Sequence, residues 1–279
     1  MSDEKREVGP VRPAAAYIGG KRRLGELLAR RIEAMPHKTY AEPFVGMGGV
    51  FFRRRWAPRR EVINDVSRDV VTLFRILQRH YPQFLETLKF QITSRAEFER
   101  LAACNVDTLT DLERAARFLY LQRLAFGGKV AGRAFGVEPS GAARFDVTKL
   151  GPQLEAIHER LAGVVIECLA WSDFVDRYDG QDTLFYLDPP YWGSEADYGP
   201  GVFARADFAR LADRLATIGG RFMLSVNDVA ETRDAFGRFA IEPVSTRYTI
   251  SGKWMDVAEI LVTGPSAEPL PKIRDLLSF

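Results

Sequence analysis

Apolar residues recur at helical spacing in several stretches of the chain. Leu24, Leu28 and Ile32 lie four residues apart, and Pro36 ends the pattern, which predicts an amphipathic helix. The same spacing predicts further helices at 70–77, throughout 81–126, and at 207–218. A capping box over 94–97 and an acidic helix start at Asp111 divide the long helical stretch. We therefore expect a block of helices with no strand between them.

Short apolar runs elsewhere in the chain predict strands. They cover residues 38–42, 61–65, 164–166, 183–187, 222–226 and 257–263. Because strands and helices alternate at both ends of the chain, we expect an α/β fold with a mostly parallel sheet. We expect residues 81–149 to form an insert in this fold. The insert is helical up to residue 126, and a glycine-rich loop or hairpin follows at 127–146. Residues 1–14 lack periodicity and are expected to form a flexible N-terminal arm.

The composition excludes several classes of protein. A chain of 279 residues with 46% hydrophobic and 27% charged residues is typical of one large globular unit with an inserted piece. No apolar stretch approaches the roughly 20 residues that cross a bilayer, and no apolar signal core follows the N-terminus, so we expect a cytoplasmic protein. Two cysteines and three histidines favour neither a disulfide framework nor a clustered metal site.

Positive charge is concentrated in one part of the sequence. Residues 21–60 hold eleven Lys and Arg against three Glu, a local charge of +8 in a chain of net charge +2. Such a segment suits a phosphate-rich partner. The alternative is that Arg30, Arg31 and the run 53–55 are solvated sides and ends of helices.

A glycine-rich turn follows the first predicted strand. The run 44–49 lies between this strand and an apolar helix start at Val50. Its glycines allow a tight turn and let an anionic group approach the amides of a helix N-terminus. Asp65 ends the next strand 19 residues after Gly46, near the spacing at which a carboxylate binds ribose hydroxyls in nucleotide-binding folds. Together these features predict a ribose-bearing ligand of unspecified kind.

A stiff polar corner follows the predicted strand 183–187. The residues are Asp188, Pro189, Pro190 and Tyr191, and parallel strand ends would place them in the same cleft as the glycine turn. Two prolines remove backbone donors, which leaves the Asp188 carboxylate and the Pro189 carbonyl as acceptors beside an aromatic ring. This arrangement suits a planar ligand with an amino group, such as a nucleic-acid base. The alternative is an ordinary turn with a core tyrosine.

The chain resembles the Dam-type (class alpha) DNA adenine-N6 methyltransferases from about residue 17 to residue 263. In family order, the resemblance is carried by Tyr17, Gly19 and Lys21; Phe44, Gly46, Gly48 and Gly49; Asn64 and Asp65; Asp173 and Phe174; and Asp188, Pro189, Pro190 and Tyr191. Tyr17 stands where the family usually has Trp, and Phe126-Gly127-Gly128 stands where many members have Phe-Asn-Gly.

This resemblance implies a Rossmann-like fold that binds S-adenosylmethionine through the first four of these sets. Lys21 would lie near the cofactor carboxylate, Asn64 and Asp65 at its ribose, and Asp173 with Phe174 beside its adenine. Residues 15–80 and 150–279 would form the catalytic domain, and 81–149 the target-recognition insert.

The implied activity is site-specific methylation of adenine in double-stranded DNA. The adenine would be flipped out of the helix, its amino hydrogens accepted by Asp188 and Pro189 and its ring stacked on Tyr191. Candidate DNA-binding residues around the glycine-rich segment are Arg123, Lys129 and Arg133. No obligate protein partner is predicted.

Four other functions fit part of the pattern. An RNA adenine methyltransferase needs the same acceptor pair. A nicotinamide-dependent oxidoreductase would explain the glycine turn and Asp65 but gives no role to Asp188 and Tyr191. A non-catalytic DNA-binding module is the third. A cytosine-amino methyltransferase is the fourth, but such enzymes usually carry Ser in place of the first Asp, so Asp188 favours adenine.

Overall fold

One mixed β-sheet forms the centre of the protein. The computed structural model describes residues 5–19, 21, 24–136, 144–199, 201–250 and 253–264, without the side chains of 245–250 and 253–257. In spatial order, the sheet contains β5 (Val165–Glu167), β4 (Arg60–Asn64), β2 (Thr39–Glu42), β6 (Thr183–Leu187), β7 (Arg221–Asn227), β9 (Lys253–Gly264) and β8 (Ala240–Ile250). The strands from β5 to β7 run parallel, and β9 pairs antiparallel with both β7 and β8. This confirms the expected α/β class.

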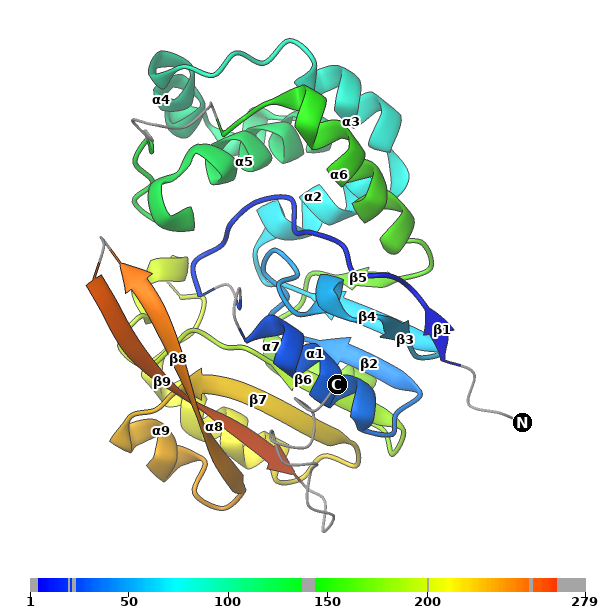
Figure 1. The fold of residues 1–279 in the computed structure, drawn as a ribbon, viewed down its shortest axis with the longest axis vertical. Coiled ribbons are helices and arrows are strands. Elements are labelled where there is room, and N and C mark those ends of the chain that lie inside the picture. Colours follow the sequence, from blue (N-terminus) through cyan, green and yellow to red (C-terminus); the bar gives the residue numbers. More distant parts are fainter. Residues whose placement is uncertain are drawn as a thin grey trace.

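Both faces of the sheet are covered, as its apolar strands require. In β6, Leu184 and Tyr186 join one hydrophobic core, whereas Phe185 and Leu187 join the other. The first core includes α1 (Gly25–Ala34), and the second includes α7 (Trp171–Tyr178) and α8 (Arg205–Leu215). A short helix, α9 (Ala230–Ala235), follows β7. Figure 1 shows α1 lying across the sheet in the foreground.

The remaining helices form a block beside the sheet, at the top of Figure 1. They are α2 (Arg68–Arg79), α3 (Tyr81–Leu88), α4 (Arg95–Ala103), α5 (Asp111–Leu124) and α6 (Val147–Arg160), and we call them the helical block. Ser94 caps the start of α4, where the sequence predicts a capping box. On α5 the capping box is formed by Thr110 and Glu113. Arg114 of α5 pairs with Asp69 of α2 at 2.6 Å, so the block includes a helix that precedes residue 81.

The helix expected from Val50 is absent, and that prediction was wrong. A short 3₁₀ turn, η1 (Phe51–Arg53), follows the glycine turn, and the chain then enters the two-residue strand β3 (Trp56–Ala57). Arg54, which follows the turn, has an extended backbone. Its side chain is fully buried, pairs with Glu61 and lies 3.6 Å from the centre of the Tyr40 ring.

The N-terminal segment is also more ordered than the sequence suggests. Strand β1 (Arg6–Glu7) pairs antiparallel with β3, and Val11 donates a backbone hydrogen bond to Phe52 at 2.7 Å. Ala14 is fully buried. From residue 5 onward the expected flexible arm therefore lies against the body of the protein, held by backbone pairing that no side-chain periodicity reveals.

The basic segment 21–60 does not form one solvated face. Lys21, Arg31 and Arg54 are all nearly inaccessible to solvent. Lys21 pairs with Asp188 and Glu259, and Arg31 pairs with Glu242, all from distant parts of the chain. Arg54 pairs with Glu61 on the nearby strand β4. Much of the local charge is thus neutralised inside the fold. Within the described ranges, no helix is long and apolar enough to cross a membrane.

Candidate functional site

Three carboxyl groups meet where neighbouring parallel strands end. Glu42 is the last residue of β2, Asp65 follows β4, and Asp188 follows β6. Because β2 pairs with β4 on one side and β6 on the other, Glu42 lies on the strand between the two aspartates. All three line a cavity of about 640 Å³, a volume typical of small-molecule and cofactor sites. The sequence prediction that the glycine turn and residue 188 share a cleft agrees with this geometry.

The glycine turn forms one wall of the cavity. Gly46 has a φ of +50°, and its amide donates a hydrogen bond to Asp65 Oδ2 at 2.9 Å. A Cβ atom at this position would lie 3.0 Å from the Tyr17 ring, so glycine is needed for both conformation and space. Asp65 Oδ1 accepts a second hydrogen bond from the Ser67 amide at 2.8 Å. Burial nevertheless raises the pKa of Asp65 to about 6.

The Asp188 carboxylate lies in a compact polar cluster. Its Oδ1 atom is 2.7 Å from Lys21 Nζ and accepts a hydrogen bond from Ser225 at 3.1 Å. Lys21 is also 3.4 Å from Glu259, and Ser225 shares a hydrogen bond with Tyr186 at 2.9 Å. Burial raises the pKa of Asp188 to about 6, against the opposing effect of the Lys21 charge.

Tyr191 completes this corner. Lys21 Nζ lies 4.4 Å from the centre of the Tyr191 ring and donates a hydrogen bond to its hydroxyl. Pro190 lines the cavity, whereas Pro189 and Tyr191 lie beside it. Trp192, which follows Tyr191, exchanges two hydrogen bonds with Asn227 at the end of β7, at 2.9 and 3.1 Å. The corner is therefore fixed to the sheet on both sides. An amino group, that of Lys21, already contacts both the acceptor and the ring.

Most cofactor-binding candidates line the cavity, but some do not. Those that do are Tyr17, Gly19, Lys21, Phe44, Gly46, Gly49 and Asp65. Gly48 has a φ of +74°, and a Cβ atom at this position would collide with the Phe52 ring. Asn64 is buried and ties two loops together, donating to Pro43 at 2.9 Å and accepting from Leu169 at 2.8 Å. Lys21 forms an ion pair with Asp188, so its side chain lies beside the catalytic candidates.

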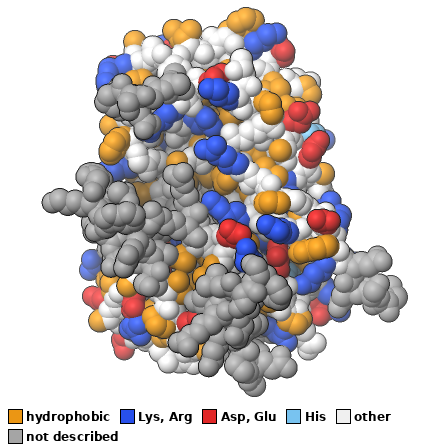
Figure 2. Space-filling model, in the orientation of Figure 1, with side chains coloured by type: hydrophobic (Ala, Val, Ile, Leu, Met, Phe, Trp, Pro, Cys, Tyr) orange, Lys and Arg blue, Asp and Glu red, His pale blue; other side chains and the backbone are white. Residues whose placement is uncertain are grey.

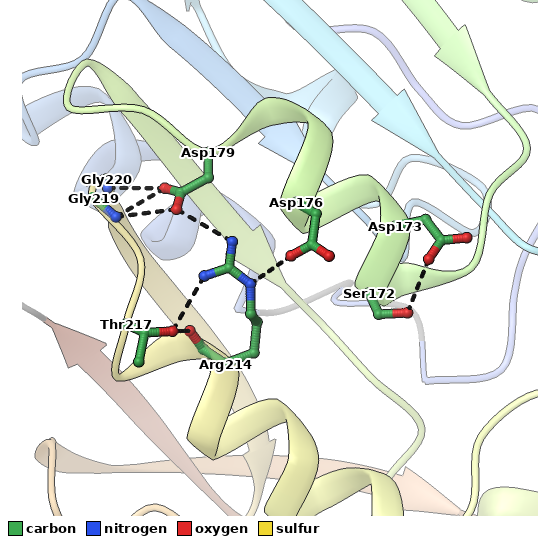
Figure 3. A network of polar contacts seen from close by, with 8 residues as sticks. All are labelled: Ser172, Asp173, Asp176, Asp179, Arg214, Thr217, Gly219 and Gly220. Atoms are coloured by element: carbon green, nitrogen blue, oxygen red, sulfur yellow. Dashed lines mark hydrogen bonds and ion pairs between the residues drawn. The ribbon is translucent and has the colours of Figure 1, made fainter.

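The pair Asp173 and Phe174 lies on α7 and does not line the cavity. Phe174 is fully buried and packs against Tyr178. Asp173 is exposed on the first turn of α7, where it accepts a hydrogen bond from Ser172 at 3.4 Å (Figure 3). Arg214 of α8 pairs with Asp176 of α7 at 2.6 Å and with Asp179, directly after α7, at 3.3 Å, and these pairs join the two helices.

The three candidate DNA-binding residues differ in exposure. Lys129 is exposed. Arg123 donates to the carbonyls of Ala14 at 2.6 Å and Arg144 at 3.0 Å, and Arg133 donates to Gln122 at 3.3 Å. Burial lowers the pKa of both arginines. They therefore contact the chain itself. On the face shown in Figure 2, Lys and Arg side chains run along the middle, from the helical block towards the sheet.

Sequence reasoning missed two acidic residues of this region. Glu42 lines the cavity, and Glu259 is buried on β9 beside Lys21. Glu259 is an acid inside the apolar run 257–262, and Glu42 ends an otherwise apolar strand before Pro43. A charged residue at such a position is the available signal. Among the residues described, no three His, Cys, Asp or Glu side chains are grouped so as to hold a metal ion.

Comparison with known proteins identifies one family and several relatives. The family model described as D12 class N6 adenine-specific DNA methyltransferase matches residues 17–250. Type II methyltransferase M1.LlaDCHI of Lactococcus lactis subsp. cremoris is 28% identical, covering 91% of this chain and 95% of that protein. Type II methyltransferase M.MjaIII of Methanocaldococcus jannaschii is 24% identical, covering 77% and 84%. Type II methyltransferase M.CviBI of Paramecium bursaria Chlorella virus NC1A is 21% identical, covering 85% and 91%.

Proposed function

Because the chain belongs to the D12 class of N6 adenine-specific DNA methyltransferases, we propose that it methylates the amino group of a flipped adenine in double-stranded DNA, with S-adenosylmethionine as the methyl donor. One observation carries the assignment of the site. The corner of Asp188 and Tyr191 already holds an amino nitrogen, that of Lys21, at the wall of a cavity large enough for a cofactor. The adenine amino group is also an N–H donor, although it is neutral and has two hydrogens.

The acceptors at this corner would activate the adenine amino group. That nitrogen is a weak nucleophile because its lone pair is delocalised into the ring. Asp188 and the Pro189 carbonyl would accept its two hydrogens and localise the lone pair, while Tyr191 holds the ring plane. Lys21 Nζ is paired with Asp188 Oδ1, and we expect it to move towards Glu259, which lies 3.4 Å from it, when adenine binds.

The cavity wall suits the cofactor. Asp65 offers a carboxylate for the ribose hydroxyls, and the turn at Gly46 leaves room for close approach of the ligand. Tyr17 and Phe44 supply aromatic surface. The bound cofactor supplies an electrophilic methyl group. Asn64 and Phe174 act through the loops and the helix that they position, and Lys21 contacts Asp188. The role of Asp173 beside the cofactor adenine stays a prediction.

Residues 81–149 provide the target-recognition insert in this proposal, and 15–80 with 150–279 the catalytic domain. Lys129 is the exposed candidate for phosphate contact. Arg12, Arg53, Arg123 and Arg144 line the cavity and add positive charge to its walls, which favours a polyanionic partner.

Methyl incorporation tests this function and separates it from its nearest rival. The chain is incubated with labelled S-adenosylmethionine and either duplex DNA or duplex RNA, and the modified nucleoside is identified by mass spectrometry. We expect N6-methyladenine in DNA. Label found only in RNA would make the enzyme an RNA methyltransferase, and label on cytosine would overturn the adenine assignment. Binding of NADH in place of the methyl donor would favour an oxidoreductase.

The methyl-transfer rate should fall in acid. The pKa of Asp188 is raised to about 6, and the carboxylate accepts a hydrogen bond from the adenine amino group, and stabilises the charge that develops on it, more strongly than the neutral acid does. The active form therefore dominates above pH 6 and is lost as the pH falls, by about tenfold per unit well below that value. Single-turnover rates with saturating cofactor and DNA between pH 5 and pH 8 measure this effect. A rate that stays constant down to pH 5 would contradict the proposed role.

Tyr191→Ala should weaken binding of the flipped adenine by about 1 to 3 kcal/mol, the usual worth of a base stacked on an aromatic ring. Tyr191→Phe is the matched control, since it keeps the ring and removes only the hydroxyl that contacts Lys21. The measurement is the fluorescence of 2-aminopurine placed at the target base. Equal base extrusion in both variants and the wild type would assign the ring to packing alone.

A further inference from the structure

The carboxyl group of Glu42 has no role in the function described above, although it lines the cavity. It is 2% exposed, and its Oε2 atom accepts a hydrogen bond from the Tyr40 hydroxyl at 2.6 Å. Tyr40 is fully buried below the ring-stacked guanidinium of Arg54, which is itself paired with Glu61. A carboxyl group that is almost inaccessible to solvent at a cavity wall needs a reason, because burial of an acid is costly.

The order of the strands indicates what Glu42 faces. In the proposed function, Asp65 binds the ribose of the methyl donor and Asp188 binds the amino group that receives the methyl. The donor sulfur is bonded to the 5′ carbon of the ribose, and its methyl group is transferred to the nitrogen of the acceptor. It must therefore lie between these two aspartates. Strand β2 lies between β4 and β6, and Glu42 is its last residue.

We propose that Glu42 binds the positive charge of the donor sulfur, so that the cavity holds the charged methyl donor more tightly than the uncharged thioether product. This inference rests on the proposed function. The donor carries a sulfonium cation, and loss of its methyl leaves a neutral thioether, S-adenosylhomocysteine. A carboxylate beside the sulfur therefore favours binding of the donor and release of the product.

The electrostatics of Glu42 support this role. Burial raises its pKa to about 8, the nearby charges of Asp188 and Asp65 raise it further, and Tyr40 and Arg54 act in the opposite direction. At neutral pH the group is mostly protonated in the free protein. A bound cation lowers this pKa, so Glu42 releases its proton to solvent when the donor binds and takes one up again when only the thioether remains.

Calorimetry of the full chain tests the inference. Binding of S-adenosylmethionine, S-adenosylhomocysteine and sinefungin, which carries an amine in place of the sulfonium, is measured at pH 7 in two buffers of different ionisation enthalpy. The wild type should release close to one proton with the two cationic ligands, fewer with S-adenosylhomocysteine, and should prefer the donor over the product. In Glu42→Gln the proton release should disappear, and the donor-to-product affinity ratio should fall by about tenfold or more.

Tyr40→Phe is the matched control. It removes the hydrogen bond that Glu42 accepts from the scaffold but leaves its carboxyl group in the cavity, so the preference for the donor should remain. Equal proton release with donor and product in the wild type would overturn the inference without use of any variant. So would a Glu42→Gln protein that keeps the full preference. A chain that binds none of the three ligands would instead refute the proposed function.

Discussion

Replacing Asp188 with alanine should lower methyl transfer to duplex DNA by about 100- to 1000-fold or more, the usual cost of removing a group that stabilises developing charge. The substitution removes the carboxylate that holds an amino nitrogen at the cavity wall, and Pro189 alone cannot accept both hydrogens. Cofactor binding should persist, because Asp65, Gly46 and Tyr17 form another part of the wall. Single-turnover transfer and calorimetric cofactor binding measure the two effects separately.

Asp182→Ala is the control for this experiment. Asp182 precedes β6 at the opposite end from Asp188, and its exposed side chain pairs with Lys38 at 2.9 Å. We expect its activity to match the wild type. Near-normal methyl transfer by the Asp188→Ala protein would show that Asp188 does not accept the amino hydrogens of the target adenine.

The second large effect concerns stability. Glu61→Ala should lower the free energy of unfolding by about 3 to 5 kcal/mol, because it leaves two buried guanidinium groups without their carboxylate. Glu61 accepts hydrogen bonds from Arg160 at 2.7 and 2.8 Å and from Arg54, and all three side chains are buried. This cluster joins α6 and the segment after η1 to β4.

Urea unfolding measures this loss, and an exposed ion pair gives the comparison. Removing the carboxylate of Asp182 from its pair with Lys38 should change stability by less than about 1 kcal/mol, as for most surface ion pairs. A similarly small loss in Glu61→Ala would mean that the cluster does not hold the helical block to the sheet.

Local patterns in the sequence predicted much of the sheet and the polar corner. The strands β2, β4, β6 and β7 lie at the runs that predict them. In β6, which is buried along its whole length, every residue after Thr183 is apolar or aromatic. The spacing between Gly46 and Asp65 corresponds to a direct hydrogen bond in the structure. Strand ends and glycine turns are short-range features, which is why the sequence reveals them.

Other parts depend on contacts between distant residues. Strand β8 was not predicted, because Pro243 and several polar residues interrupt it; its place at the edge of the sheet accommodates them. The buried position of Arg54 follows from Glu61 and Tyr40, and no local pattern marks it. Likewise, Glu259 joins the Asp188 corner only through the pairing of β9 with β7.

A crystal structure of the protein with duplex DNA and sinefungin tests the central claim most directly. We expect an adenine outside the helix, with its amino nitrogen within hydrogen-bond distance of both Asp188 and the Pro189 carbonyl, and with Lys21 Nζ moved from Asp188 towards Glu259. A target base bound elsewhere, with the Lys21 and Asp188 pair intact, would contradict the account.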